Sequence, residues 1–192
     1  MATEHDSVDL VGDEVVSRFA RAALVAALMG ATAWIAVPWI GDAPATFQVL
    51  IVFLAGIYLG PVWGAASIAI YLVAGAVGAP VFSGGSAGLG AFAGPTGGYL
   101  VSFPIGAFIV GAIVHRGVEL RDPTDVSPVT LAGAMVVAAA VIYAIGAPWM
   151  GFVLEYSAWE TLFAGVLVFI PWELIEIAIA LAVVRSGLIS IK

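Results

Sequence analysis

The chain has 192 residues, of which 62% are hydrophobic and only 10% are charged, and its mean hydropathy is +1.13. A typical soluble domain carries about 25% charged residues, so we predict a multi-pass integral protein of the plasma membrane. The net charge of −7 argues against nucleic-acid binding, and the absence of cysteine excludes disulfides, thiolate metal sites and a cysteine nucleophile.

The chain order predicts an acidic cytoplasmic tail over residues 1–14 and one all-α membrane domain over residues 15–192. Within that domain, residues 43–115 contain no Asp, Glu, Lys or Arg. At about 1.5 Å per helical residue, this run makes roughly 110 Å of helix, enough to cross a hydrocarbon core of about 30 Å about three times. Proline and glycine positions divide the domain into six predicted helices, at about 16–38, 46–60, 63–79, 95–115, 128–147 and 160–185.

The basic residues predict the orientation of these six helices. All six lie on inside segments, or at the inside ends of helices, if the N-terminus is cytoplasmic: Arg18, Arg21, Arg116, Arg121, Arg185 and Lys192. Cytoplasmic loops are enriched in Lys and Arg, so this distribution predicts six spans with both termini in the cytoplasm. An aromatic belt at the outer boundary then contains Trp34, Trp39, Trp149, Tyr156 and Trp159.

Two carboxylates fall near the middle of the last predicted helix. Glu173 and Glu176 share one helix face at spacing i, i+3, and a charge at mid-bilayer costs on the order of 3 kcal/mol. We therefore expect both side chains to face the bundle interior, with Pro171 bending the helix before them. No other span has Lys or Arg in its middle. The two acids then either share a proton, are satisfied by neighbouring helices, or receive hydrogen bonds from a ligand such as a cyclic urea.

A glycine- and serine-rich segment, 83-SGGSAGLGAFAGPTGGYL-100, forms the second polar feature. Its backbone N–H groups, together with the N-terminus of the helix that follows, could hold an anion without a cationic side chain. Close helix packing is the commonest role of glycine in membrane proteins, and it remains the alternative. We interpret His5 and His115 as solvated, and we expect no metal and no cofactor.

Two runs of the sequence carry a resemblance to a known family. The segments 44-PATFQVLIVFLAGIYLGPVWGA-65 and 71-YLVAGAVGAPVFSGGSAGLGAFAGPTGGYLVSFPIGA-107 resemble the BioY family of biotin transporters. These are the substrate-binding S components of energy-coupling factor (ECF) transporters. The resemblance implies a six-helix fold that captures biotin from outside. It also implies two kinds of partner, a transmembrane coupling protein and two ABC ATPases.

The sequence departs from the family pattern at two places. The family's last helix usually carries Asp-x-x-Lys after a proline, whereas here Glu173 keeps the acid and Glu176 stands in place of the basic residue. Some members carry Arg in the glycine-rich loop, where this chain has Ser86. Three explanations stay open: the amides and hydroxyls of the loop take the biotin carboxylate, Glu176 is protonated, or the ligand differs from biotin.

We predict an S component that takes up biotin, with Glu173 accepting the ureido N–H groups and the 83–99 loop closing over the ligand. The candidate ligand-binding residues are Phe47, Gln48, Tyr71, Ser83, Gly84, Gly85, Ser86, Thr96, Tyr99, Trp149, Trp172, Glu173 and Glu176. Small residues at spacing four on the first helix, Ala22, Ala26 and Gly30, form the expected docking face for the coupling protein, and Ala23, Ala27 and Ala31 form a parallel stripe.

There are four alternatives to this function, of which a purely structural membrane subunit does not explain the two acids of the last predicted helix. A solitary proton-coupled vitamin carrier would use Glu173 and Glu176 as its relay, and an S component for a related small vitamin would keep the fold and change the ligand. An intramembrane enzyme is disfavoured because the spans contain no Ser/His or Ser/Lys pair and no paired Asp motif.

Overall fold

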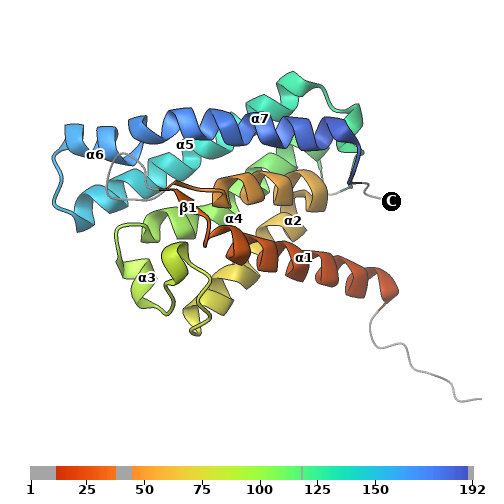
Figure 1. Ribbon diagram of the computed structural model, residues 1–192. Coiled ribbons are helices and arrows are strands. Elements are labelled where there is room, and N and C mark those ends of the chain that lie inside the picture. Colours follow the sequence, from red (N-terminus) through yellow and green to blue (C-terminus); the bar gives the residue numbers. More distant parts are fainter. Residues whose placement is uncertain (1–11, 38–44, 118, 190–192) are drawn as a thin grey trace, which may run out of the picture.

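The computed structural model describes residues 12–37, 45–117 and 119–189, which form a helical bundle with one small β-hairpin (Figure 1). The elements are α1 (Asp13–Thr32), β1 (Ala36–Val37), β2 (Ala45–Thr46), α2 (Gln48–Ala76), η1 (Ser83–Gly85), α3 (Gly90–Ala93), α4 (Gly97–His115), η2 (Pro123–Asp125), α5 (Pro128–Val153), α6 (Ala158–Gly165), η3 (Leu167–Phe169) and α7 (Ile170–Ser186). Most of the predicted acidic tail, together with Trp39 and Lys192, lies outside the described residues.

Five described helical stretches are long and apolar enough to cross a membrane, with α6 to α7 counted as one. This finding supports the prediction of a multi-pass membrane protein. The helix boundaries differ from prediction at two ends. Helix α1 ends at Thr32 because the chain beyond it forms a strand, in which Ala36 pairs with Thr46. Helix α5 continues through Pro148 to Val153, because bundle packing tolerates an interior proline at membrane depth.

Helix α2 reverses direction at Gly60, where the sequence predicts a turn between two helices. Gly60 has φ 77° and ψ −178°, a backbone conformation that favours glycine. In a straight helix, residues 55 and 64 would lie about 13.5 Å apart along the axis. Instead, a Cβ placed on Gly64 would lie 2.8 Å from the carbonyl oxygen of Ala55. The two halves of α2 therefore fold back on each other.

Helix α4 packs closely into this reversal. A Cβ on Gly111 would lie 2.4 Å from the backbone nitrogen of Pro61, and a Cβ on Gly56 would lie 2.4 Å from the carbonyl oxygen of Ala107. These glycines let two backbones approach without an intervening side chain, as small residues do in membrane bundles. Most of the core around this contact forms two clusters, one shared by α2, α4, α5 and α7 and one shared by α1, α2 and α4 together with Phe82 and Ile142, and a small third cluster contains Met150 and Ala164.

The last predicted helix is broken, which corrects the expectation of one helix over 160–185. Helix α6 ends at Gly165, Val166 departs from helical geometry, and α7 begins only at Ile170. Pro171 explains the break, because it has no N–H to donate and its ring would clash with the carbonyl of Leu167. As a consequence, Glu173 lies in the first turn of α7 and not in the middle of a helix.

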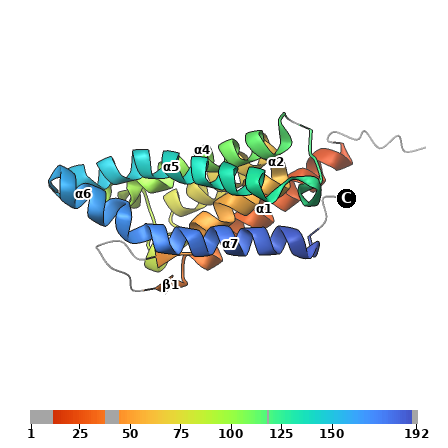
Figure 2. The same ribbon diagram turned by 90° about the horizontal axis from the view of Figure 1, so that it is seen from above.

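All five described arginines lie at one end of the bundle. The guanidinium of Arg185 donates to the carbonyl oxygens of Thr124 (3.0 Å) and Val126 (2.8 Å), which ties the end of α7 to the loop after α4. The other four line two hollows that the same loop helps to form: Arg18, Arg21, Arg116 and Arg121. The start of α1 and the end of α7 lie at the same end in both ribbon views (Figures 1 and 2).

His115 is buried at this end of the bundle, contrary to the expectation that it is solvated. Only 2% of the residue is exposed. Its Nδ1 accepts a hydrogen bond from the backbone N–H of Arg121 (3.0 Å), so Nε2 carries the ring proton and donates to the carbonyl of Ile57 (2.9 Å). That carbonyl lacks its usual helical donor because Pro61, four residues later, has no N–H. His115 therefore joins the α2 reversal to the loop after α4.

We expect His115→Leu to lower the free energy of unfolding by about 2–4 kcal/mol, because it leaves the buried carbonyl of Ile57 and the partly buried N–H of Arg121 without their partners. Thermal or denaturant unfolding in detergent measures this change. His115→Gln is the matched control, since its side-chain amide retains a donor, and it should cost less. Equal stability of the wild type and His115→Leu would show that the two hydrogen bonds do not hold this corner together.

Candidate functional site

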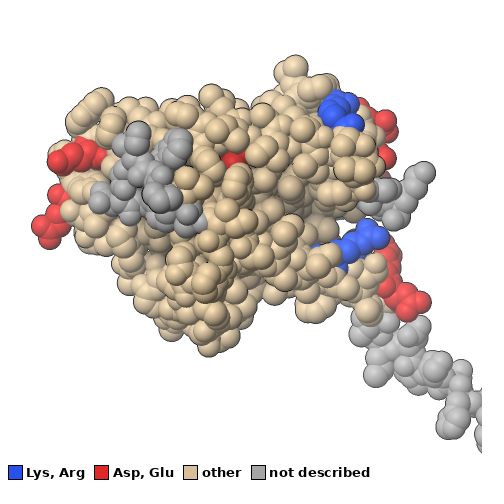
Figure 3. All heavy atoms as spheres, in the orientation of Figure 1, with Lys and Arg blue, Asp and Glu red and all other residues tan. Residues whose placement is uncertain are grey.

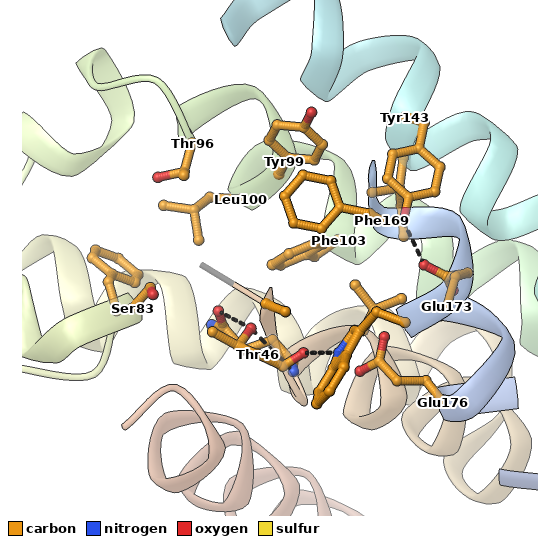
Figure 4. Close-up of a pocket in the computed structure, with 16 residues that line it drawn as sticks. Thr46, Ser83, Thr96, Tyr99, Leu100, Phe103, Tyr143, Phe169, Glu173 and Glu176 are labelled. Carbon is orange, nitrogen blue, oxygen red and sulfur yellow. Dashed lines mark hydrogen bonds between the residues drawn. The ribbon is translucent and has the colours of Figure 1, made fainter. Parts of the chain in front are cut away.

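A cavity of about 90 Å³ lies where helices α2, α4, α5 and α7 meet near the starts of α2, α4 and α7 (Figure 4). Its walls are mostly apolar and aromatic, with a few polar groups that converge on the space, as is usual for small-molecule sites. The lining residues are Ala45, Thr46, Gln48, Val49, Phe82, Ser83, Thr96, Tyr99, Leu100, Phe103, Ile142, Tyr143, Phe169, Trp172, Glu173 and Glu176.

Glu173 presents an unpaired carboxylate oxygen at this cavity. The residue is 7% exposed, and its Oε2 accepts a hydrogen bond from the hydroxyl of Tyr143 at 2.7 Å. Its Oε1 is buried and has no hydrogen-bond partner within the described part of the chain. A buried acceptor without a donor is costly, and the positive end of the α7 dipole favours a negative charge here. The site is therefore prepared for a ligand that donates hydrogen bonds.

Glu176 is engaged differently, although it lines the same cavity one turn further along α7. It is 1% exposed, and its Oε1 accepts a hydrogen bond from the backbone N–H of Leu50 at 3.0 Å. Leu50 lies in the first turn of α2, whose N–H groups have no partner within the helix. Glu176 thus caps α2 from the neighbouring helix α7. This contact supplies a structural reason for the second acid.

A short hydrogen-bonded chain fixes the polar groups at the start of α2. The hydroxyl of Thr46 donates to Gln48 Oε1 (3.0 Å), and Gln48 Nε2 donates to the hydroxyl of Tyr71 (2.6 Å). The indole N–H of Trp172 donates to the carbonyl of Thr46 (3.0 Å), which ties α7 to the same segment. These bonds use the polar atoms of Gln48 within the protein, so Gln48 shapes this wall.

The amides at the start of the glycine-rich loop are already hydrogen-bonded within the protein. The N–H groups of Gly84, Gly85 and Ser86 donate to the carbonyls of Ala33, Phe82 and Ser83, respectively. The Ser83 hydroxyl, in contrast, is buried at the cavity and has no hydrogen-bond partner among the residues that the structure describes. Of the donors predicted in this loop, the hydroxyls of Ser83 and Thr96 reach the cavity, and the amides at 84–86 are occupied.

The structure brings seven of the predicted ligand-binding residues together in the cavity wall: Gln48, Ser83, Thr96, Tyr99, Trp172, Glu173 and Glu176. Two others lie directly behind the wall. Tyr71 is buried and hydrogen-bonded to Gln48, and Phe47 packs its ring against Trp172 with centroids 4.9 Å apart.

The remaining four predicted residues lie away from the cavity wall. Gly84 and Gly85 form the η1 turn, Ser86 is exposed with its hydroxyl bonded to the Ser83 carbonyl, and Trp149 donates its indole N–H to the carbonyl of Gly94. Trp149 is 38% exposed, so it lies on the bundle surface.

The predicted docking stripe on α1 needs correction. Ala22, Ala26 and Gly30 are all buried, and a Cβ on Gly30 would lie 3.0 Å from the Val81 side chain. These residues allow close packing inside the bundle, so they are not available to a partner. In the parallel stripe, Ala27 and Ala31 are exposed.

Sequence reasoning missed nine cavity residues, namely Ala45, Thr46, Val49, Phe82, Leu100, Phe103, Ile142, Tyr143 and Phe169. A usable signal existed for Tyr143, because the only other side-chain hydroxyl of its predicted span is Thr130 near the start, and a hydroxyl within an apolar span needs a partner in lipid. The apolar residues carry no such signal, since core and cavity walls have the same composition.

The described spans define a multi-pass membrane protein with a cavity between its helices, and its fold is that of a solved transporter S component. The chain superposes with a TM-score of 0.80 on a crystal structure of the S component for biotin from an ECF-type ABC transporter, covering 93% of this chain and 94% of that one. The two sequences are 23% identical, so this likeness establishes the fold.

Sequence comparison identifies the family. The model of the BioY family matches residues 3–191, and the chain belongs to this family, as the resemblance predicted. It is 40% identical over 161 residues to the probable biotin transporter BioY of Pyrococcus horikoshii, covering 84% of this chain and 90% of the relative. It is 31% identical over 160 residues to the biotin transporter BioY of Thermotoga maritima, covering 83% and 89%.

Proposed function

We propose that this protein captures biotin in the cavity between α2, α4, α5 and α7 and delivers it across the membrane. The observation that carries the proposal is the buried, unpaired Oε1 of Glu173. The ureido ring of biotin offers two N–H donors, and a carboxylate is their strongest neutral-pH acceptor in a protein. The hydroxyl of Tyr143, bonded to Oε2, holds the carboxylate in place for this contact.

The cavity has a second polar end that suits the biotin carboxylate. Ser83 and Thr96 lie on one side of the space and Glu173 on the other (Figure 4). Biotin is similarly bipolar, with a ureido ring at one end and a carboxylate at the other. Apolar and aromatic side chains between the two ends, such as Leu100 and Phe103, suit the bicyclic ring and the alkyl chain. We place the carboxylate against the hydroxyls of Ser83 and Thr96.

We expect Ser83→Ala to weaken biotin binding about tenfold, because a hydrogen bond to a charged group contributes about 1.5–3 kcal/mol. Calorimetric titration of biotin and of biotin methyl ester measures the effect, and the variant should weaken biotin more than the ester. Ser86→Ala is the matched control from the same loop, since Ser86 does not line the cavity. An equal loss for both ligands would place the carboxylate elsewhere.

We further propose six membrane crossings with both termini in the cytoplasm. The reversal of α2 at Gly60 supplies the sixth crossing, since each half of α2 then runs in an opposite direction. The arginine-bearing end contains the start of α1, the loop after α4 and the end of α7. An even number of crossings returns the chain to this end, and the positive-inside rule assigns it to the cytoplasm.

In this proposal the chain works with a transmembrane coupling protein and two ABC ATPases, as its family membership leads us to expect. The exposed small residues Ala27 and Ala31 offer the coupling protein a place for close approach on α1. Uptake of radiolabelled biotin by biotin-auxotrophic cells tests the transport function. Cells that express the chain with an ECF coupling protein and its ATPases should take up biotin faster than cells that express an ATPase variant unable to hydrolyse ATP.

The alternative, a solitary proton-coupled carrier, rests on the two acids that face one cavity. Uptake by the chain alone that collapses with a protonophore would establish this alternative and contradict the ATPase-dependent account. Uptake that is insensitive to the protonophore and requires the ATPases would support the S-component function.

A further inference from the structure

A hollow of about 180 Å³ lies at the arginine-bearing end, apart from the ligand cavity. Helix α1 contributes Arg18 and Arg21 to it, and the α2 reversal contributes Tyr58 and Trp63. The rest of its wall is apolar: Leu59, Pro61, Val62 and Leu120. The hollow therefore combines two guanidinium groups with aromatic and aliphatic side chains at one end of the membrane spans.

The charge in this hollow is not neutralised by its own walls. None of the residues that line it is acidic, whereas the neighbouring hollow with Arg116 and Arg121 also contains Asp122 and Asp125. Arg18 forms one ion pair, with the exposed Glu14, which leaves other N–H donors of its guanidinium free. Arg21 has no hydrogen bond or ion pair in the parts of the chain described here. Blue side chains at this end stand beside the start of α1 in Figure 3.

The lining residues and the position of the hollow indicate the chemical class of its ligand. Guanidinium groups bind phosphate oxygens in a bidentate manner, and basic pockets between membrane helices bind anionic lipid headgroups. Val62 lines the hollow and is 56% exposed, so an apolar surface continues from the charged site toward the lipid. Tyr58 and Trp63 are of the kind that lies at the headgroup level of a bilayer.

We propose that the hollow binds the phosphodiester headgroup of an anionic phospholipid, with Arg18 and Arg21 on the phosphate and the acyl chains along the exposed apolar side chains of this region. Such a lipid would join α1 to the α2 reversal, two elements that meet at this end of the bundle. This lipid site lies apart from the ligand cavity, so the proposal does not depend on which ligand the protein transports.

Native mass spectrometry of the purified full-length protein, with phosphatidylglycerol or phosphatidylcholine of identical acyl chains, tests the proposal. The wild type should retain phosphatidylglycerol in preference to phosphatidylcholine. Arg21→Gln should reduce phosphatidylglycerol binding about tenfold, because it removes a charge-assisted contact, and the double variant with Arg18→Gln should abolish the preference. Arg116→Gln, which removes a charge from the neighbouring hollow, is the matched control and should keep it.

Circular dichroism of each variant establishes that the helices are intact, and Arg21→Lys, which keeps the charge but not the planar fork, should fall between the wild type and Arg21→Gln. The proposal would be overturned if Arg21→Gln and the double variant both preferred phosphatidylglycerol as strongly as the wild type does. It would also be overturned if the wild type showed no preference. Displacement of the lipid by millimolar inorganic phosphate would also overturn it, by showing that the hollow takes phosphate from solution.

Discussion

Glu173→Ala should abolish high-affinity biotin binding. The substitution removes the buried acceptor that faces the cavity and leaves the Tyr143 hydroxyl without its partner. Truncating one side of a buried, charged hydrogen bond costs about 2–5 kcal/mol, which corresponds to a loss of roughly 30-fold to several thousandfold in affinity. Calorimetric titration of biotin into the purified variant in detergent measures the loss directly.

Two variants make this result specific. Glu173→Gln keeps the size of the side chain and one acceptor but removes the charge, so its affinity should fall by about tenfold, between the wild type and Glu173→Ala. Glu155→Ala, which removes an exposed carboxylate beyond the end of α5, should bind as the wild type does. Unchanged affinity in Glu173→Ala would remove this acid from the binding mechanism.

Glu176→Ala should destabilise the fold, because it leaves the Leu50 N–H buried without an acceptor at the start of α2. An unsatisfied buried donor costs about 1–3 kcal/mol, and the lost side-chain volume adds to this cost. Unfolding of the purified protein by heat or denaturant measures the difference from the wild type. A lower midpoint with intact helical content before the transition is the expected result.

Glu176→Gln separates this capping role from a role in ligand binding. Its side-chain oxygen can still accept the hydrogen bond from Leu50, so stability and biotin affinity should both stay close to the wild type. A Glu176→Gln protein that is stable but binds no biotin would contradict the capping account and place Glu176 on the ligand. A stable Glu176→Ala protein would show that α2 does not need this cap.

Most of the fold could be predicted from the backbone preferences of single residues, above all glycine and proline. The glycine and proline at positions 60 and 61 predicted a tight turn or kink between two helices, and the structure has a reversal there, with Gly60 at positive φ. Pro171 predicted a bend, but the break begins at Val166, where the helix loses its regular geometry before the proline is reached. The β-hairpin between Ala36 and Thr46 carries no local pattern, since each of its strands has only two residues.

Site residues could be predicted where a polar side chain within the membrane has a high free-energy cost. The two acids were found for this reason and Ser83 was found from the glycine- and serine-rich segment, and all three line the cavity. The different roles of Glu173 and Glu176 were not predictable from the sequence. They depend on the hydrogen bond from the Leu50 amide to Glu176, and these two residues are 126 positions apart in the chain. It was also not predictable which stripe of small residues on α1 is buried. The two stripes have the same spacing and differ only in which one meets α2.

The most direct measurement is a calorimetric titration of biotin into the purified wild-type protein. Our account predicts saturable binding of one biotin per chain, with competition by analogues that keep both ureido N–H groups and none by analogues methylated at those nitrogens. Absence of biotin binding to a folded protein would contradict the account, and the BioY fold would then serve a different ligand.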